Sequence, residues 1–348
     1  MYKKFFISFL TLTIAFIFIC TSLVFFVDPF NHYRANQDKT KIIYQLPYYQ
    51  NIGIAKYAPY DTLITGSSMT QNFNALCFNE KFCCDAIRLS FDGGILSDYC
   101  TLLTCATKYN PNLKYIYFGL DNYLITADSS LLNETNRIPD YLSDTNPFND
   151  VKYLLNKDVV FNYTRTYFSY KFSDSYDFYK MHSWDNGTVN FSKDSVLNGY
   201  VHPIPQSEKK SDFFIKEAKT LANNIGCIVK NNPNIEFIFF APPYSILYWN
   251  TILVEGKLPA TITAIAKVYE SLFQFDNVRI FYFQDNKEMI VNLDNYKDPT
   301  HYRTSYNEYM LECFATGKNE LSSETYRYTL TEMQNWVENY NFDLLFKG

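Results

Sequence analysis

The chain has 348 residues, of which 47% are apolar, and 31 basic against 36 acidic side chains give a formal net charge of −5. This length and composition suit a globular protein with one large domain or two small ones. The basic residues form no run longer than Lys209-Lys210, which excludes the cationic surface of a nucleic-acid-binding protein, and no nucleic acid is expected as a partner.

Residues 5–27 are 23 consecutive residues without a charge, enough to cross the core of a lipid bilayer as a helix. We therefore expect residues 1–27 to anchor the chain in a membrane. A cleaved signal peptide is the alternative, although no Ala-x-Ala-like cleavage site follows the apolar run. Lys3 and Lys4 precede the span and Asp28 follows it, so the positive-inside rule places residues 28–348 on the outer side of the cell membrane.

Seven of the eight cysteines lie beyond this segment, so at least one must be unpaired within the monomer. Cys83-Cys84 lacks the spacing of a zinc site, and neither a metal nor a cofactor is expected. Aromatic residues make up 19% of the chain, which suits a large core or a carbohydrate-facing surface.

Residues 28–60 are polar and aromatic, and Asp28-Pro29 should end the first helix. We expect this juxtamembrane segment to lead into a domain at 61–322. Short apolar runs that end in Gly, Pro or Asp are typical of buried parallel strands. Such runs lie at 62–65, 86–89, 115–118, 237–240 and 278–283, with helical patterns at 69–78, 96–108, 211–231, 258–275 and 305–314.

This alternation predicts the α/β class, as a three-layer α/β/α sandwich around a central parallel sheet. The 90 residues at 121–210 are too long for an ordinary connection, and we interpret them as an inserted cap over the strand ends. Residues 323–348 are expected to form a C-terminal helix.

The turn Gly66-Ser67-Ser68 follows the first predicted strand directly and precedes a helical pattern. In open α/β sheets the reacting groups gather at the carboxyl ends of the strands. A serine there can be a nucleophile, with helix N–H groups nearby to stabilise an oxyanion. Ser68 is the first candidate and Ser67 the alternative. A simple turn with a helix-capping serine has the same sequence.

Asp298-Pro299-Thr300-His301 places a carboxylate three residues before one of only four histidines. A carboxylate can hold one ring nitrogen of a histidine protonated while the other accepts a proton from serine. The spacing therefore predicts Ser68 as nucleophile, His301 as base and Asp298 as the group that orients His301. A helix-capping role for Asp298, ahead of the helix expected at 305–314, is the alternative.

These blocks resemble the SGNH (GDSL-like) hydrolase superfamily over most of residues 61–314, which implies its flavodoxin-like fold and serine hydrolase chemistry. Gly66-Ser67-Ser68 matches the family's Gly-Asp-Ser, and Asp298-Pro299-Thr300-His301 matches its Asp-x-x-His. The resemblance implies an oxyanion N–H at Gly93 or Gly94. The family's Gly-x-Asn-Asp appears as Gly119-Leu120-Asp121-Asn122, so an ionised Asp121 replaces the donor, and either Asn122 or backbone N–H groups must serve.

The amino-terminal span and the Gly-Ser-Ser variant look similar to the membrane-anchored branch of this superfamily, which includes the lipoteichoic-acid D-alanylation and alginate O-acetylation proteins. That resemblance implies an esterase or acyltransferase for O-acyl groups of a cell-surface polysaccharide or teichoic-type polymer. It also implies a membrane-bound O-acyltransferase as partner. The alternatives are a non-catalytic accessory or glycan-binding protein, with a site that has decayed at Asp121, and a secreted lipase.

Overall fold

A computed structural model of the chain describes residues 2–127, 137–173 and 176–346. It separates into two compact units. Unit 1 consists of Met1–Pro59, Cys105–Pro111 and Asn136–Met181, and unit 2 consists of Tyr60–Thr104, Asn112–Thr135 and His182–Gly348. The segment 121–210, expected as one insertion, is thus divided between the units, and its residues 128–136 and 174–175 lie outside the described part of the chain.

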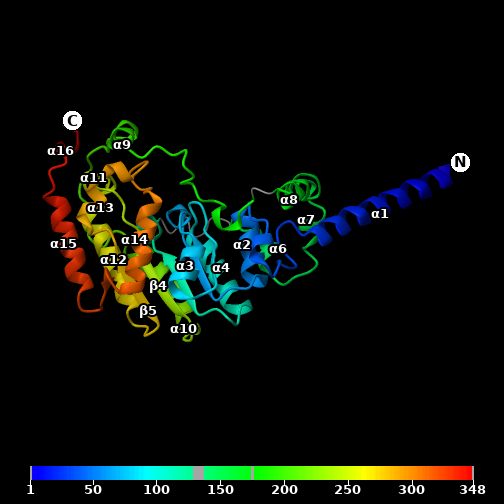
Figure 1. Ribbon diagram of the computed structural model, residues 1–348, viewed down its shortest axis with the longest axis horizontal. Coiled ribbons are helices and arrows are strands. Elements are labelled where there is room, and N and C mark those ends of the chain that lie inside the picture. Colours follow the sequence, from blue (N-terminus) through cyan, green and yellow to red (C-terminus); the bar gives the residue numbers. More distant parts are fainter. Residues whose placement is uncertain (1, 128–136, 174–175, 347–348) are drawn as a thin grey trace. The chain divides into compact units, whose positions relative to one another are not determined.

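Unit 2 is built on a six-stranded sheet in the order β2-β1-β3-β4-β5-β6, so the mixed α/β class is as predicted (Figure 1). The first five strands are parallel and β6 pairs antiparallel with β5. The sequence did not predict β6, which has only two residues. The strands are β1 (Thr62–Thr65), β2 (Ala86–Arg88), β3 (Tyr115–Gly119), β4 (Glu236–Ala241), β5 (Val278–Tyr282) and β6 (Glu320–Leu321).

Aromatic side chains from successive strand positions point to opposite faces of the sheet and meet different helices. Phe314 of α14 (Thr304–Thr316) contacts Tyr117 and Phe240, with ring centroids 5.3 Å away in both cases. Tyr99 of α4 (Leu96–Tyr109) contacts the next residue of β3, Phe118, at 5.0 Å. Much of the aromatic content therefore forms the core of this unit.

Two predicted helices have different bounds in the structure. The pattern at 69–78 becomes the short 3-10 helix η2 (Ser68–Thr70) followed by α3 (Ala75–Phe82), whose first turn is capped by the side chain of Asn74. The C-terminal segment forms α15 (Tyr326–Glu338) and α16 (Asp343–Phe346) instead of one helix. The other helices of unit 2 are α5 (Asn122–Thr126), α9 (Lys193–Gly199), α10 (Ile215–Asn231), α11 (Ile246–Val254), α12 (Leu258–Leu272), α13 (Lys287–Val291) and η6 (Leu293–Asn295).

Unit 1 contains the amino-terminal helix α1 (Tyr2–Val27), which is long and apolar enough to cross a membrane and is mostly exposed in the protein. A signal sequence has the same length and composition. Asp28 ends the helix with φ +48°, and its carboxylate accepts the backbone N–H groups of His32, Tyr33 and Arg34. The remaining helices are η1 (Lys39–Lys41), α2 (Pro47–Tyr57), α6 (Asp140–Ser143), α7 (Val151–Leu154), the π-helix η4 (Val159–Tyr163), α8 (Thr164–Lys171) and η5 (Phe178–Lys180).

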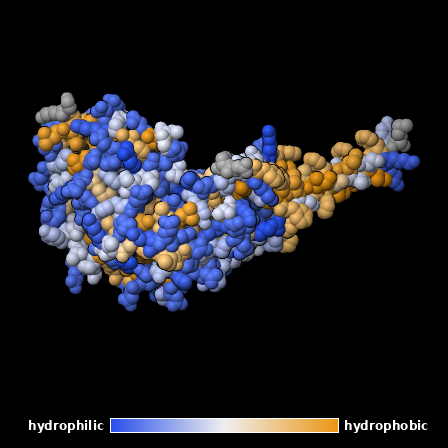
Figure 2. Space-filling model, viewed as in Figure 1, coloured by the Kyte–Doolittle hydropathy of each residue, from blue (hydrophilic) through white to orange (hydrophobic). Residues whose placement is uncertain are grey.

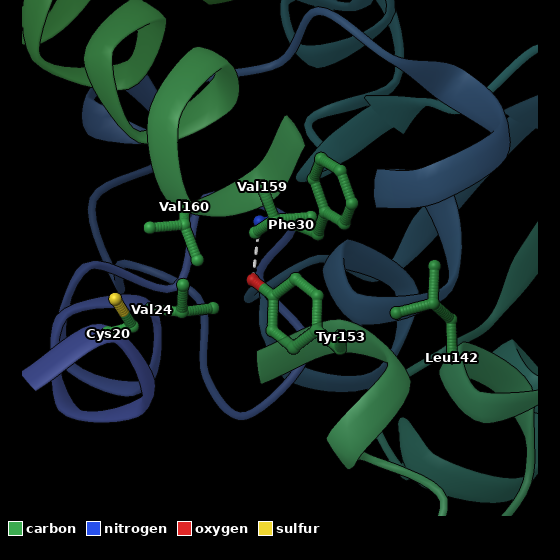
Figure 3. Close-up of a cluster of buried hydrophobic side chains, with 7 residues drawn as sticks. All are labelled: Cys20, Val24, Phe30, Leu142, Tyr153, Val159 and Val160. Carbon is green, nitrogen blue, oxygen red and sulfur yellow. Dashed lines mark hydrogen bonds between the residues drawn. The ribbon is translucent and has the colours of Figure 1, made fainter. Parts of the chain in front are cut away.

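A small hydrophobic core joins the carboxyl end of α1 to the rest of unit 1 (Figure 3). Cys20 and Val24 of α1 are buried against Tyr153, Val159 and Val160. The Tyr153 hydroxyl lies at the centre, where it donates to Asp28 at 2.9 Å and accepts the backbone N–H of Phe30 at 3.1 Å. The last two turns of α1 are therefore an integral part of this unit.

Candidate active site

The turn after β1 is shaped by Gly66, which has φ +146° and lies against another backbone segment. A Cβ atom at this position would come within 2.6 Å of the Thr70 side chain and 3.2 Å of the Gly119 backbone. Glycine avoids both contacts and tolerates the positive φ. The chain can thus leave the sheet sharply, and the next two residues, Ser67 and Ser68, lie at the carboxyl edge of β1.

Ser68 and Ser67 have different environments although they are adjacent. The Ser68 side chain is partly exposed, and its Oγ lies 2.8 Å from Nε2 of His301. Ser67 is only 2% exposed, and its hydroxyl oxygen accepts the backbone N–H of Met69 at 3.2 Å. Of the two candidate nucleophiles, the structure brings Ser68 to the histidine and buries Ser67 beneath it.

Asp298 lies on the other side of the His301 ring, with its carboxylate oxygens 2.8 and 3.0 Å from Nδ1. The same carboxylate accepts the backbone N–H groups of Thr300 and His301, both at 2.9 Å, in a local turn typical of aspartate. Burial alone would raise the pKa of Asp298. The hydrogen bond and charge of His301 and the two N–H donors outweigh burial and hold that pKa well below its ordinary value.

An ionised Asp298 fixes the proton of His301 on Nδ1, so that Nε2 is left as the acceptor for the Ser68 hydroxyl. The loop that carries this pair is held by a bridge between its ends and by hydrogen bonds at its middle. Tyr296 and Tyr302 form an antiparallel bridge, and the Pro299 carbonyl accepts both the N–H and the hydroxyl of Ser245. The capping alternative for Asp298 does not apply, because Asp185 accepts the first N–H of α14, from Thr304, at 2.8 Å.

Asp121 does not face the solvent beside Ser68 but is buried, with 1% of its surface exposed. Tyr244 donates a short hydrogen bond to its carboxylate, and the hydroxyl and backbone N–H of Ser67 donate to it as well. Burial raises the pKa of Asp121 to about 6, and these donors, together with the charge of His301, limit the rise. Asp121 thus lies beneath the turn that carries Ser68 and stabilises this turn through its hydrogen bonds to Ser67.

The predicted oxyanion donors are only partly available. The Asn122 amide donates to Gln284 at 3.1 Å and to the Tyr248 hydroxyl, so both of its N–H hydrogens have acceptors. The Gly94 N–H donates to the Phe91 carbonyl at 3.3 Å, whereas Gly93 is exposed in a left-handed turn with φ +57°. The Ser68 backbone N–H, by contrast, has no acceptor among the described residues.

Trp184 contacts both members of the Ser68–His301 pair, and sequence reasoning missed it. Its indole N–H donates to the Ser68 carbonyl at 2.8 Å, and its ring meets His301 edge to face, with centroids 5.3 Å apart. The neighbouring Ser183 hydroxyl and Asp185 N–H both donate to the side-chain oxygen of Asn72. Nothing in the sequence relates a tryptophan in a polar segment to a serine 116 residues away.

Two cations lie on the aromatic side chains around the site. The Lys297 ammonium is 4.2 Å from the centroid of the Trp184 ring, and the Arg303 guanidinium is 4.8 Å from that of Phe191. Neither cation has a carboxylate partner within the described residues. In that part of the chain, no group of three or more His, Cys, Asp or Glu side chains is arranged to hold a metal ion.

Comparisons with known proteins do not identify a family for this chain. No protein-family model matches the chain, and no curated protein matches it. A solved structure from Streptococcus pneumonia, provisionally described as a platelet activating factor, is similar over 78% of this chain and 89% of its own. The TM-score is 0.40 and the sequence identity 9%.

Proposed function

We propose that this chain is a membrane-anchored, extracytoplasmic serine esterase or acyltransferase of the SGNH type, acting on O-acyl groups of a cell-surface polysaccharide or teichoic-type polymer. The observation that carries the proposal is the hydrogen-bonded series Ser68–His301–Asp298, with 2.8 Å from Oγ to Nε2 and 2.8 Å from Nδ1 to the carboxylate. Helices that contact both faces of the sheet agree with the three-layer fold of that superfamily.

In the proposed reaction Ser68 Oγ attacks the acyl carbonyl while Nε2 of His301 takes the hydroxyl proton. The resulting imidazolium is stabilised by Asp298. His301 then returns the proton to the leaving oxygen of the donor ester, whose bond to the acyl carbon breaks and leaves an acyl group on Ser68. In the second half, water or a sugar hydroxyl gives its proton to His301 and attacks the acyl carbon. The bond between the acyl carbon and Ser68 Oγ then breaks, and His301 passes the proton to Oγ.

The negative oxygen of the tetrahedral intermediate needs hydrogen-bond donors. The N–H of Ser68 is the donor that the local geometry favours, since it has no other acceptor among the described residues. The second donor in this proposal is the N–H of Gly93 or Gly94, as the resemblance implies, although the Gly94 N–H also donates to the Phe91 carbonyl. Lys297 and Arg303 support a substrate with anionic groups, as in a teichoic-type polymer, because both cations lack a carboxylate partner in the described chain.

One observation favours the alternative of a non-catalytic accessory protein. The amide of Asn122, at the position where the superfamily places an oxyanion donor, is committed to Gln284 and Tyr248. Loss of one such donor typically costs about 100- to 1000-fold in rate. The proposal therefore expects slow hydrolysis of simple esters and requires that the residual activity depend on Ser68 and His301.

Turnover of a chromogenic acetyl ester by the purified full-length chain tests this. Ser68→Ala and His301→Gln should each reduce kcat to the background rate. Ser271→Ala should not, because Ser271 lies near the end of α12, remote in sequence from both residues, and its hydroxyl donates to the Lys267 carbonyl. Equal rates for wild type and Ser68→Ala would remove the catalytic proposal and leave the accessory protein in its place.

A further inference from the structure

The helical segment 159–171 of unit 1 has two unlike faces. Phe161 and Phe168 are 60% and 38% exposed, and Phe172, just past the end of α8, is 78% exposed. They are spaced by seven and four residues, which places them on one side of a helix. The aromatic rings of Phe168 and Phe172 stack, with centroids 6.2 Å apart. An apolar stripe therefore runs along the exposed side of this segment.

The other face of the same segment packs on the membrane-anchor helix. Val159 and Val160 of η4 are buried in the core that contains Cys20 and Val24 of α1 (Figure 3). The stripe is consequently fixed beside the last two turns of α1. It does not belong to a free loop, because contacts on its inner face set its position within unit 1.

Further exposed apolar side chains lie on and around α7, which also contacts α1 and η4. Phe148 is 87% exposed, Val151 51% and Leu155 41%. On α1 itself, Phe26 is 75% exposed at the same end. Figure 2 shows apolar residues along α1 and continuing around its base beside α7 and α8. We call Phe148, Val151, Leu155, Phe161, Phe168 and Phe172 the collar.

Cations are interspersed with the collar. Lys152, Lys157, Arg165 and Lys171 are all exposed, and none has a carboxylate partner in the described part of the chain. Against them the segment 148–172 contains only Asp150, which pairs with His32, and Asp158, which accepts the side-chain N–H of Asn162. Apolar side chains mixed with unpaired cations are typical of segments that lie in the interface of a lipid bilayer.

The length of α1 brings the collar to the interface between the bilayer core and the headgroups. Its 26 residues extend over about 39 Å, whereas the hydrocarbon core of a bilayer is about 30 Å thick. The final turns, to which the collar is attached, therefore reach the boundary between acyl chains and headgroups. A second protein is not needed to cover the collar, because its surface is continuous with the lipid-facing surface of α1.

We infer that the collar inserts into the outer interface of the bilayer that α1 crosses, with its cations at the level of the phosphate groups. Unit 1 then contacts the membrane through the collar as well as through the span α1. The inference uses the membrane span of the proposed function and none of its chemistry, so a failure of the serine mechanism would leave it intact.

Quenching of tryptophan emission by brominated lipids tests this on the full-length chain in liposomes. The three native tryptophans, Trp184, Trp249 and Trp336, lie in unit 2 and give the background. Phe161→Trp, Phe168→Trp and Phe172→Trp each add a reporter to the stripe. Phe213→Trp is the matched control, because Phe213 is also exposed, at 55%, but belongs to unit 2.

Most of the emission added at the three stripe positions should be lost in brominated lipid, and that added at position 213 should be retained. Quenching should deepen when anionic lipid is included, since unpaired cations are attracted to it. Unquenched stripe emission would overturn the inference, and so would equal quenching at position 213. Tryptophan emission from the stripe positions that is shifted to shorter wavelength but not quenched would also contradict the inference. The collar would then be covered by protein, either a second copy or another part of the chain.

Discussion

Replacing Asp121 with asparagine should remove a step from the pH dependence of stability. Burial raises the pKa of this carboxyl from 3.8 to about 6 in the folded protein. Below the unfolded pKa both states are protonated and the group has no effect. As pH rises through the folded pKa, the unfolded chain ionises more readily, so stability is lost. The difference between the two pKa values corresponds to about 3 kcal/mol at about 1.4 kcal/mol per pH unit.

Urea unfolding of the full-length chain in detergent, followed by tryptophan fluorescence, measures this effect, because all three tryptophans lie in unit 2 with Asp121. Other groups also titrate. Burial raises the pKa of Asp285 to about 6, and Asp298, with its lowered pKa, acts in the opposite direction. The informative quantity is therefore the difference in free energy of unfolding between wild type and Asp121→Asn. It should shift by about 3 kcal/mol in favour of the variant between about pH 4 and pH 7. If the free energies of unfolding of wild type and variant changed with pH in the same way, Asp121 would not be buried as a carboxylate.

Three further predictions concern the site and the anchor. Asp298→Asn should lower kcat by about 10⁴-fold, because the amide no longer holds the proton of His301 on Nδ1; an unchanged kcat would exclude the orienting role. Trp184→Phe removes the indole hydrogen bond to the Ser68 carbonyl, worth about 1 kcal/mol, and should reduce kcat/KM about fivefold without altering membrane association; no change would make Trp184 a packing residue only. Protease added to intact cells should cleave beyond residue 28, whereas release of a chain with a trimmed amino terminus would identify residues 5–27 as a cleaved signal.

The sheet could be predicted from the sequence because its strands are continuous apolar runs, a pattern that depends only on local composition. Thr62–Thr65 and the neighbouring runs at 86–88, 115–119, 236–241 and 278–282 are confirmed as strands, within one or two residues. The same pattern locates Ser68 and His301, since Ser68 lies just beyond the first strand and His301 just before the helix expected at 305–314. Asp298 is three residues from His301 and so is fixed by a local turn.

The parts that could not be predicted depend on long-range partners. The helix expected at 69–78 is interrupted because the Asn72 side chain is bound by Ser183 and Asp185, more than 100 residues away. Trp184 reaches Ser68 through the same segment. The role of Asp121 was misjudged for a similar reason: its sequence position suggested a group facing the substrate, whereas Tyr244 and Ser67 hold it beneath the turn.

Reaction of the full-length chain with a serine-directed phosphonate, followed by mapping of the adduct, tests the central claim most directly. The Ser68 hydroxyl is partly exposed and bonded to His301, so we predict a single adduct at Ser68 that is lost in Ser68→Ala and His301→Gln. Ser67→Ala should keep most of the labelling, because Ser67 is buried. An adduct at Ser67, or a chain that stays unlabelled under conditions that label an active serine hydrolase, would contradict the account.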